Sequence, residues 1–283
     1  MAAILIGTSH GTDDPAGQAA VRALLDGVRA ARPGLDVREA FVDVQQPEVG
    51  EVLTGAMRDA DAAVSDGAAL DGASGAGAGA SGAGASGAGA PEDGPAAVVV
   101  PLLLSTGYHV RHDIAQAVAA VNASDEGVAV AAEPLGPHPL LVDILADRYA
   151  AAEAAHGPFR SDDAVVLAAA GSSVAAAATA VEEVTSALAQ RLGRVVTPSY
   201  GAGAEPRVPA AVAAARAGAP GMPGAARVIV VSYLLAPGYF LDRVLEAGAD
   251  VVTDPVAGPA GAEKADPRLV EVVLDRFDAA VRS

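Results

Sequence analysis

Two histidines stand at positions where chemistry can take place, because each comes at the end of an apolar run that small residues interrupt. His10 follows residues 4–9, and His109 follows residues 98–108. We predict that each run is a parallel strand and that a helix begins just after it. In an open α/β sheet, ligands bind at the carboxyl ends of the strands, beside the point where the strand order reverses. Two imidazoles at that edge therefore indicate a metal-binding or proton-transfer site.

A carboxylate is expected next to the two imidazoles. Asp43 follows residues 36–42, which have the composition of another strand. In the strand order 2-1-3-4, which is typical of flavodoxin-like sheets, the first strand lies between this strand and the one that precedes His109. The side chains of His10, His109 and Asp43 then approach one another. Two histidines and one carboxylate with open positions suit Fe(II), Co(II) or Ni(II).

The segments that must position these side chains alternate between strand-like and helix-like patterns, which predicts βαβ units and a parallel sheet in an α/β fold. The first helix has the clearest signals, since Asp13 or Asp14 can cap it, Pro15 fits its first turn, and apolar residues follow at helical spacing. Strands are predicted at residues 3–8, 36–42, 97–104 and 127–133, and helices at residues 48–64, 110–122 and 138–155.

Residues 67–95 interrupt this pattern, because they consist mostly of glycine, alanine and serine. Such a composition offers almost no apolar side chain to bury and cannot offset the entropy that is lost on ordering. We predict a disordered loop at the amino end of the following strand, away from the predicted site.

The second half of the chain repeats the first. Residues 138–149 align without gaps with residues 266–277, and residues 103–109 resemble residues 234–240. This pattern indicates a tandem duplication. We therefore predict two domains, 1–155 and 162–283, each a small parallel sheet flanked by helices.

The duplication also provides an internal comparison of the two candidate histidines. The second copy keeps the surrounding glycine and tyrosine residues but has Ala170 and Phe240 where the first copy has His10 and His109. If the fold itself required histidines, the second copy would need them too. We therefore assign the chemistry to the first half. The second half is interpreted as a degenerate copy that makes a monomer resemble a dimer.

Composition excludes several other classes of protein. A formal net charge of −17 argues against nucleic-acid binding, which requires a basic surface. The absence of cysteine excludes disulfides, thiolate metal sites and cysteine nucleophiles. No apolar run is long enough to span a membrane, and the N-terminus lacks the basic region of a signal peptide. We expect a cytoplasmic protein.

Four motifs in the first half resemble those of the class II sirohydrochlorin chelatases, the CbiX/SirB family. His10-Gly11-Thr12 after the first strand resembles the family's His-Gly-Ser signature, and Phe41-Val42-Asp43-Val44-Gln45-Gln46-Pro47 resembles its Phe-Leu-Glu-x-x-x-Pro segment. Pro101-Leu102-Leu103-Leu104, followed by Gly107-Tyr108-His109-Val110 and Asp113-Ile114, resembles its second histidine segment. Leu135-Gly136 resembles its closing strand. The resemblance covers residues 1–150 and, in weaker form, the second copy.

The resemblance implies an enzyme that inserts Co(II) or Fe(II) into sirohydrochlorin for cobalamin or siroheme biosynthesis. By that resemblance His10 and His109 bind the metal, and one of them accepts pyrrole protons as the metal enters the ring. Asp43 stands where the family has a metal-binding glutamate. Its shorter side chain leaves open whether it binds the metal directly, binds through water or orients a histidine.

The substrate implied by the resemblance is a polycarboxylate, so cationic residues near the site are candidate partners. Arg111 and Arg22 are expected close to the site in the predicted fold, and His112 follows His109 by one helical turn. Because the phosphate-binding Gly-x-x-x-x-Gly-Lys-Ser/Thr pattern is absent, the sequence does not indicate ATP.

Two alternative functions stay open. Residues 7–11 also fit Gly-x-Ser-x-Gly, which would make Ser9 the nucleophile of a serine hydrolase, although the chain has no histidine beyond His156. A metal or tetrapyrrole carrier without turnover would use the same residues as a chelatase.

Overall fold

The structure, a computed structural model, describes residues 3–71, 94–105, 107–124, 127–218 and 223–283. The side chains of residues 63–71 and 108–110 are not part of that description. Within the described ranges, no helix combines the length and the apolar character needed to cross a membrane.

Each half of the chain contributes strands and helices in strict alternation. The first half contains β1 (Ile4–Ser9), α1 (Pro15–Ala31), β2 (Val37–Phe41), α2 (Val49–Asp71), β3 (Ala97–Pro101), α3 (Tyr108–Asn122), β4 (Ala129–Ala131) and α4 (Pro139–His156). The second half contains β5 (Ala164–Ala169), α5 (Ala175–Leu192), β6 (Val196–Tyr200), α6 (Val208–Ala217), β7 (Val228–Tyr233), α7 (Tyr239–Leu245), β8 (Val251–Val252) and α8 (Pro267–Val281).

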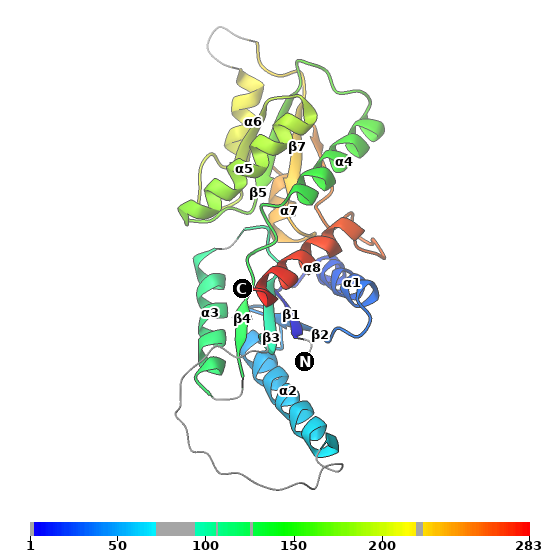
Figure 1. Cartoon of the computed structure of the whole chain (residues 1–283). Helices are drawn as coiled ribbons and strands as arrows, with labels where there is room; N and C mark the ends of the chain where they lie inside the picture. The colour runs from blue at the N-terminus through cyan, green and yellow to red at the C-terminus, as the bar shows by residue number, and fades with distance from the viewer. Residues whose placement is uncertain (1–2, 72–93, 106, 125–126, 219–222) are drawn as a thin grey trace, which may run out of the picture.

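The strands form two parallel four-stranded sheets with the orders β2-β1-β3-β4 and β6-β5-β7-β8 (Figure 1). This result confirms the predicted α/β class, the 2-1-3-4 order and the tandem repeat. The central strands β1, β3, β5 and β7 are almost entirely buried, as expected for parallel strands covered on both faces. Asp14 caps α1, because its Oδ1 accepts hydrogen bonds from the backbone N–H groups of Ala16 and Gly17.

Two predicted boundaries differ from the structure by more than two residues. The helix predicted to end at residue 64 continues to Asp71, because its alanine-rich sequence keeps a high helix propensity. The predicted disordered loop therefore cannot begin at residue 67, and its main part, residues 72–93, lies outside the described residues. The strand predicted to extend to residue 104 ends at Pro101. Three residues beyond this strand, the Leu104 carbonyl has no partner in the described sheet ladder and accepts a hydrogen bond from the Tyr233 hydroxyl of the second half.

The last helix of each half packs against the sheet of the other half. Helix α4 contacts α5, β7 and β8, whereas α8 contacts α1, β3 and β4, and the two helices also contact each other. Figure 1 shows α4 (green) beside β7 and α5, and α8 (red) beside α1. Arg148 of α4 donates to the Val256 carbonyl at 3.2 Å, and Arg276 of α8 donates to the Leu135 carbonyl at 3.1 Å. Equivalent residues thus make reciprocal contacts, which is the pattern of a two-fold interface.

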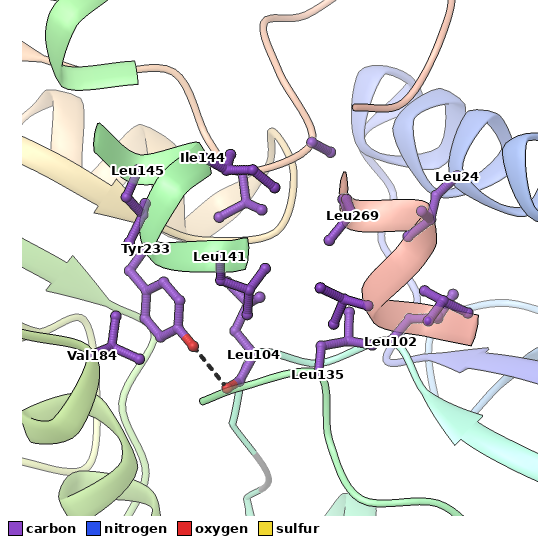
Figure 2. Packing of buried hydrophobic residues seen from close by; sticks show 14 of the residues in the cluster. Leu24, Leu102, Leu104, Leu135, Leu141, Ile144, Leu145, Val184, Tyr233 and Leu269 are labelled. Carbon is purple, nitrogen blue, oxygen red and sulfur yellow. Dashed lines mark hydrogen bonds between the residues drawn. The ribbon is translucent and has the colours of Figure 1, made fainter. Parts of the chain in front are cut away.

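Because the helices are exchanged, both halves contribute to one hydrophobic core. Leu141, Ile144 and Leu145 of α4 belong to the same cluster as Tyr233 of the second half, and Leu269 of α8 belongs to it with Leu24 of the first half (Figure 2). A second cluster on the other face of each sheet comes from one half alone. The division into domains 1–155 and 162–283 stays a prediction.

Candidate functional site

The carboxyl ends of β1 and β2 bring two of the predicted site residues together. The sheet ladder continues past both strands, since Val42 donates its backbone N–H to the Ser9 carbonyl at 3.0 Å and Asp43 donates to the His10 carbonyl at 3.1 Å. His10 and Asp43 are both exposed. His10 and Asp43 are therefore neighbours on adjacent strands at the edge where α/β proteins bind ligands.

A glycine makes this close approach possible. Gly11 has φ +90°, and a Cβ at this position would lie 2.7 Å from the Asp43 carbonyl oxygen and 3.2 Å from the Cβ of Val44. Next to it, Thr12 donates its backbone N–H to Oε1 of Gln45 at 2.9 Å. Only glycine fits both this backbone conformation and this space. The hydrogen bond between Gln45 and Thr12 was not predicted from the sequence, because no sequence pattern indicates a side chain that connects two loops.

The carboxylate of Asp43 lies in a turn that a β-branched residue rarely adopts. Val44 has φ +49°, and its backbone N–H donates to Oδ1 of Asp43 at 2.8 Å. Positive φ is uncommon outside glycine, and such residues concentrate at functional sites. In the second half, the same turn contains Gly203 with φ +67°. The first half thus keeps a strained residue beside its candidate ligand where its copy has a glycine.

The third predicted ligand, His109, follows β3, whose carboxyl end lies at the same edge of the sheet. Strand β3 pairs with β1, Leu102 donates its backbone N–H to the Thr8 carbonyl at 2.8 Å, and α3 begins one residue before His109. The side chain of His109 lies outside the described part, so its meeting with His10 and Asp43 stays a prediction. Among the side chains that are described, no group of three or more candidate ligands could hold a metal ion.

The predicted substrate-binding residues lie on two different helices. Arg111 and His112 are exposed in the first turns of α3, close to the edge. Arg22 lies farther back on α1, where its guanidinium donates to the backbone carbonyl and Oε1 of Gln18. Burial raises the pKa of Glu39 on β2, and the charge of Arg22 partly opposes that shift. Arg111 and His112 therefore lie at the start of the helix that follows β3, and Arg22 lies near Glu39 of β2. The roles of all three in substrate binding stay predictions.

Ser9 is placed poorly for the alternative hydrolase chemistry. It is the last residue of β1 and is only 6% exposed. A nucleophile elbow holds its serine exposed on a sharp turn after the strand. This burial removes the main ground for a serine hydrolase.

The equivalent edge of the second half has the same backbone but different side chains. There Ala202 donates its backbone N–H to the Ala170 carbonyl at 2.8 Å, which repeats the contact between Asp43 and His10. All three candidate ligands are therefore replaced, because Phe240 occupies the position of His109. The replacements of the two histidines were predicted from the repeat. Ala202 was missed, although counting from the shared proline of the two turns would have found it.

The two edges meet where the halves of the chain contact each other. A Cβ at Gly238, just before α7, would lie 3.4 Å from Oγ1 of Thr12. A Cβ at the equivalent Gly107, just before α3, would lie 3.9 Å from Oγ of Ser172, the equivalent of Thr12. The loop after the first strand of each half therefore lies against the residue that precedes α7 or α3 in the other half.

Solved structures share this fold over the whole chain. SirB from Bacillus subtilis with Fe3+ is 17% identical, with a TM-score of 0.69 over 99% of this chain and 96% of that one. SirB from Bacillus subtilis subspecies spizizenii in complex with cobalt is 15% identical, with a TM-score of 0.66 over 100% of this chain and 96% of that one. CbiX, described as the terminal enzyme for biosynthesis of siroheme in denitrifying bacteria, is 20% identical, with a TM-score of 0.56 over 98% and 99%.

No curated protein matches the chain significantly. The family model of CbiX, in contrast, matches residues 4–64, 90–152 and 164–280, which include both halves and every candidate site residue. Since this match covers most of the sequence, the chain belongs to the CbiX family.

Proposed function

We propose that the protein is a sirohydrochlorin chelatase that inserts Co(II) or Fe(II) into sirohydrochlorin without ATP. The observation that carries the proposal is the pairing of His10 and Asp43 through one backbone hydrogen bond of 3.1 Å at the carboxyl edge of the first sheet. The family match supports the reaction class, and the two similar SirB structures are described with Fe3+ and with cobalt. Both metals suit the same ligands, so availability would decide which is inserted.

The reaction exchanges one dication for two protons and transfers no electrons. The metal ion binds the ring nitrogens while two pyrrole N–H protons leave, so the site needs a weakly held metal and a base. A neutral imidazole can act either as a ligand or as a proton acceptor near neutral pH. We assign these roles to His10 and His109, with one imidazole on the metal and one accepting protons.

Asp43 supplies the negative charge that favours a divalent ion at this edge. One of its oxygens, Oδ1, accepts a hydrogen bond from Val44, which leaves Oδ2 for a metal ion, a metal-bound water or His10. The exposure of both His10 and Asp43 suits a metal that must be released to a second substrate. Arg111 and His112, exposed on α3, are proposed partners of the substrate carboxylates.

An anaerobic time course of macrocycle absorbance tests the proposal. With Co(II), metal-free sirohydrochlorin and no nucleotide, the wild-type protein should form many equivalents of product above the spontaneous rate. His10→Ala should lose this turnover, whereas His156→Ala, a change at the exposed end of α4, should keep it. Turnover in His10→Ala at the wild-type rate would refute the assignment.

The same assay separates the chelatase from a carrier. A metal or tetrapyrrole carrier would change the absorbance of the bound macrocycle in proportion to protein and would then stop. Product in large excess over protein would exclude that alternative.

A further inference from the structure

The second half of the chain presents an exposed aromatic pair at the edge that has lost the candidate ligands. Tyr239 is 68% exposed and Phe240 is 37% exposed, and their ring centroids lie 5.5 Å apart in an edge-to-face arrangement. The other tyrosine and phenylalanine side chains that the structure describes are buried or half-buried. Exposed aromatic side chains that gather at one place usually mark a binding surface.

This pair stands close to the candidate metal site. It begins directly after Gly238, which lies against Thr12, two residues beyond His10. Figure 1 shows α7 at the level where the two halves meet. The ring of Phe240 lies across Gly201, because a Cβ there would stand 2.7 Å from its Cδ1 atom. The ring is thus supported by its own half while more than a third of the residue stays exposed.

The two edges also differ in charge. Four positions are acidic around the first edge and basic or uncharged around the second, which are Asp13 and Ser173, Asp14 and Val174, Asp43 and Ala202, and Glu48 and Arg207. Two positions change in the opposite direction, since Glu205 replaces Gln46 and Asp242 replaces Arg111. The second edge is therefore less acidic than the first. A second cation, Arg243, stacks 5.6 Å from the ring centroid of Tyr239. It pairs with Glu246 at 3.1 Å, but both side chains are more than half exposed, so this ion pair is weak and exchangeable.

A chelatase must bind two substrates of opposite character, a small dication and a flat polycarboxylate. An acidic edge suits the first and repels the second, which matters in a chain with a net charge of −17. An aromatic surface flanked by arginines suits the second, because rings stack on a flat macrocycle and guanidinium groups pair with carboxylates. The differences between the duplicated edges match this division.

We infer that the second half is the macrocycle-binding wall, on which Phe240 and Tyr239 contact the tetrapyrrole ring and Arg207 and Arg243 pair with its carboxylates. This inference rests on the proposed function. In it, the first half delivers the metal, and the second half holds the ring against it.

Binding of metal-free sirohydrochlorin, followed by the absorbance of the macrocycle, tests the inference. Phe240→Ala should weaken binding about tenfold, as expected for loss of an aromatic contact. Phe240→Trp should bind like the wild type, because it keeps an aromatic surface. Val195→Ala, which removes an 86% exposed apolar side chain at the amino end of β6, is the matched control and should change nothing.

A charge-reversal variant tests the inference without changing Phe240. The double substitution Arg207→Glu and Arg243→Glu should weaken macrocycle binding further, and the difference from wild type should shrink as salt is added. Binding of Co(II) alone, measured by calorimetry, should be the same in every variant. In steady state, KM for the macrocycle should rise while KM for Co(II) stays constant.

The outcomes separate this inference from the proposed function. If the wild-type protein neither binds nor metallates sirohydrochlorin, the proposed function fails. If the wild type does both and Phe240→Ala binds the macrocycle equally well, only the inference is overturned. Equal weakening in Phe240→Ala and Phe240→Trp would also overturn it, because an aromatic ring would then not be what binds.

Discussion

Replacing Gly11 by alanine should damage the candidate site and the fold together. The new Cβ would lie 2.7 Å from the Asp43 carbonyl oxygen and 3.1 Å from the Gln45 backbone nitrogen, and the first of these distances is shorter than real Cβ contacts. Relief requires the turn of Asp43 to move away from His10. Gly11→Ala therefore perturbs the two proposed metal ligands without removing either of them.

The size of the effect follows from two contributions. A residue with a Cβ at φ +90° costs about 1–2 kcal/mol in backbone strain. Displacing packed backbone atoms costs roughly 1–3 kcal/mol more. We therefore expect Gly11→Ala to lower the free energy of unfolding by about 2–4 kcal/mol.

Two other glycines provide matched controls. Gly34 has φ +96°, and a Cβ added there would have no atom within 4 Å, so Gly34→Ala should show the strain alone. Gly171 is the equivalent of Gly11 in the second half, and its Cβ would lie 2.0 Å from the Ala202 carbonyl oxygen. Gly171→Ala should be at least as destabilising as Gly11→Ala and should leave Co(II) binding unchanged.

The assay combines urea unfolding with calorimetric titration of Co(II) at a temperature where all three variants are folded. Gly11→Ala should be less stable than Gly34→Ala and should bind Co(II) more weakly than both controls. If Gly11→Ala matches Gly34→Ala in stability, the close packing at this turn is refuted. If Gly171→Ala loses Co(II) binding to the same extent, the site does not belong to the first half.

Two further predictions concern buried polar groups outside the site. Tyr233→Phe leaves the buried Leu104 carbonyl without its 3.2 Å hydrogen bond and should cost about 1–2 kcal/mol in urea unfolding. Burial raises the pKa of Tyr233, so its stabilising effect is complete below its unfolded pKa of about 10 and is lost as pH rises, and Tyr233→Phe should lessen that alkaline decline. Burial acts to raise the pKa of Asp163, but hydrogen bonds from Arg227 and a backbone N–H outweigh it and lower the pKa. Its stabilisation is therefore present above about pH 4 and is lost as pH falls through the folded pKa, so the acid unfolding of Asp163→Asn should be shallower than that of the wild type, and an unchanged curve would contradict this account.

Local patterns predicted the elements well where a cap or a strand signal was present. Asp14 and Pro15 mark the start of α1, and the buried valines of β3 mark a central strand. The strand order followed from the general behaviour of parallel α/β sheets and was confirmed. The predicted end of α2 was wrong, because alanine favours a helical conformation even in a segment with few apolar side chains to bury.

The exchange of α4 and α8 could not be predicted from these patterns. An apolar helix face shows that a helix is covered, but it does not show which of two similar sheets covers it. The duplication made the problem harder, because each sheet offers nearly the same surface. Only the contacts of residues far apart in the chain, such as Arg276 with Leu135, decide the pairing.

The sequence was enough to predict which residues form the candidate site. It was not enough to predict the turn and the hydrogen bond that hold them in place. His10 and Asp43 follow strands, so their shared edge could be predicted. The left-handed turn at Val44 and the bridge from Gln45 to Thr12 depend on close backbone approach, which leaves no periodic signal. These supporting residues are where further substitutions should be tested.

The most direct test of the central claim is a crystal structure of the protein soaked in Co(II), with anomalous difference density measured at the cobalt absorption edge. We predict one strong peak at the carboxyl edge of β1, between the imidazoles of His10 and His109 and close to the Asp43 carboxylate. A strong peak away from these residues, or one beside Ala170 in the second half, would contradict the assignment of metal chemistry to the first half.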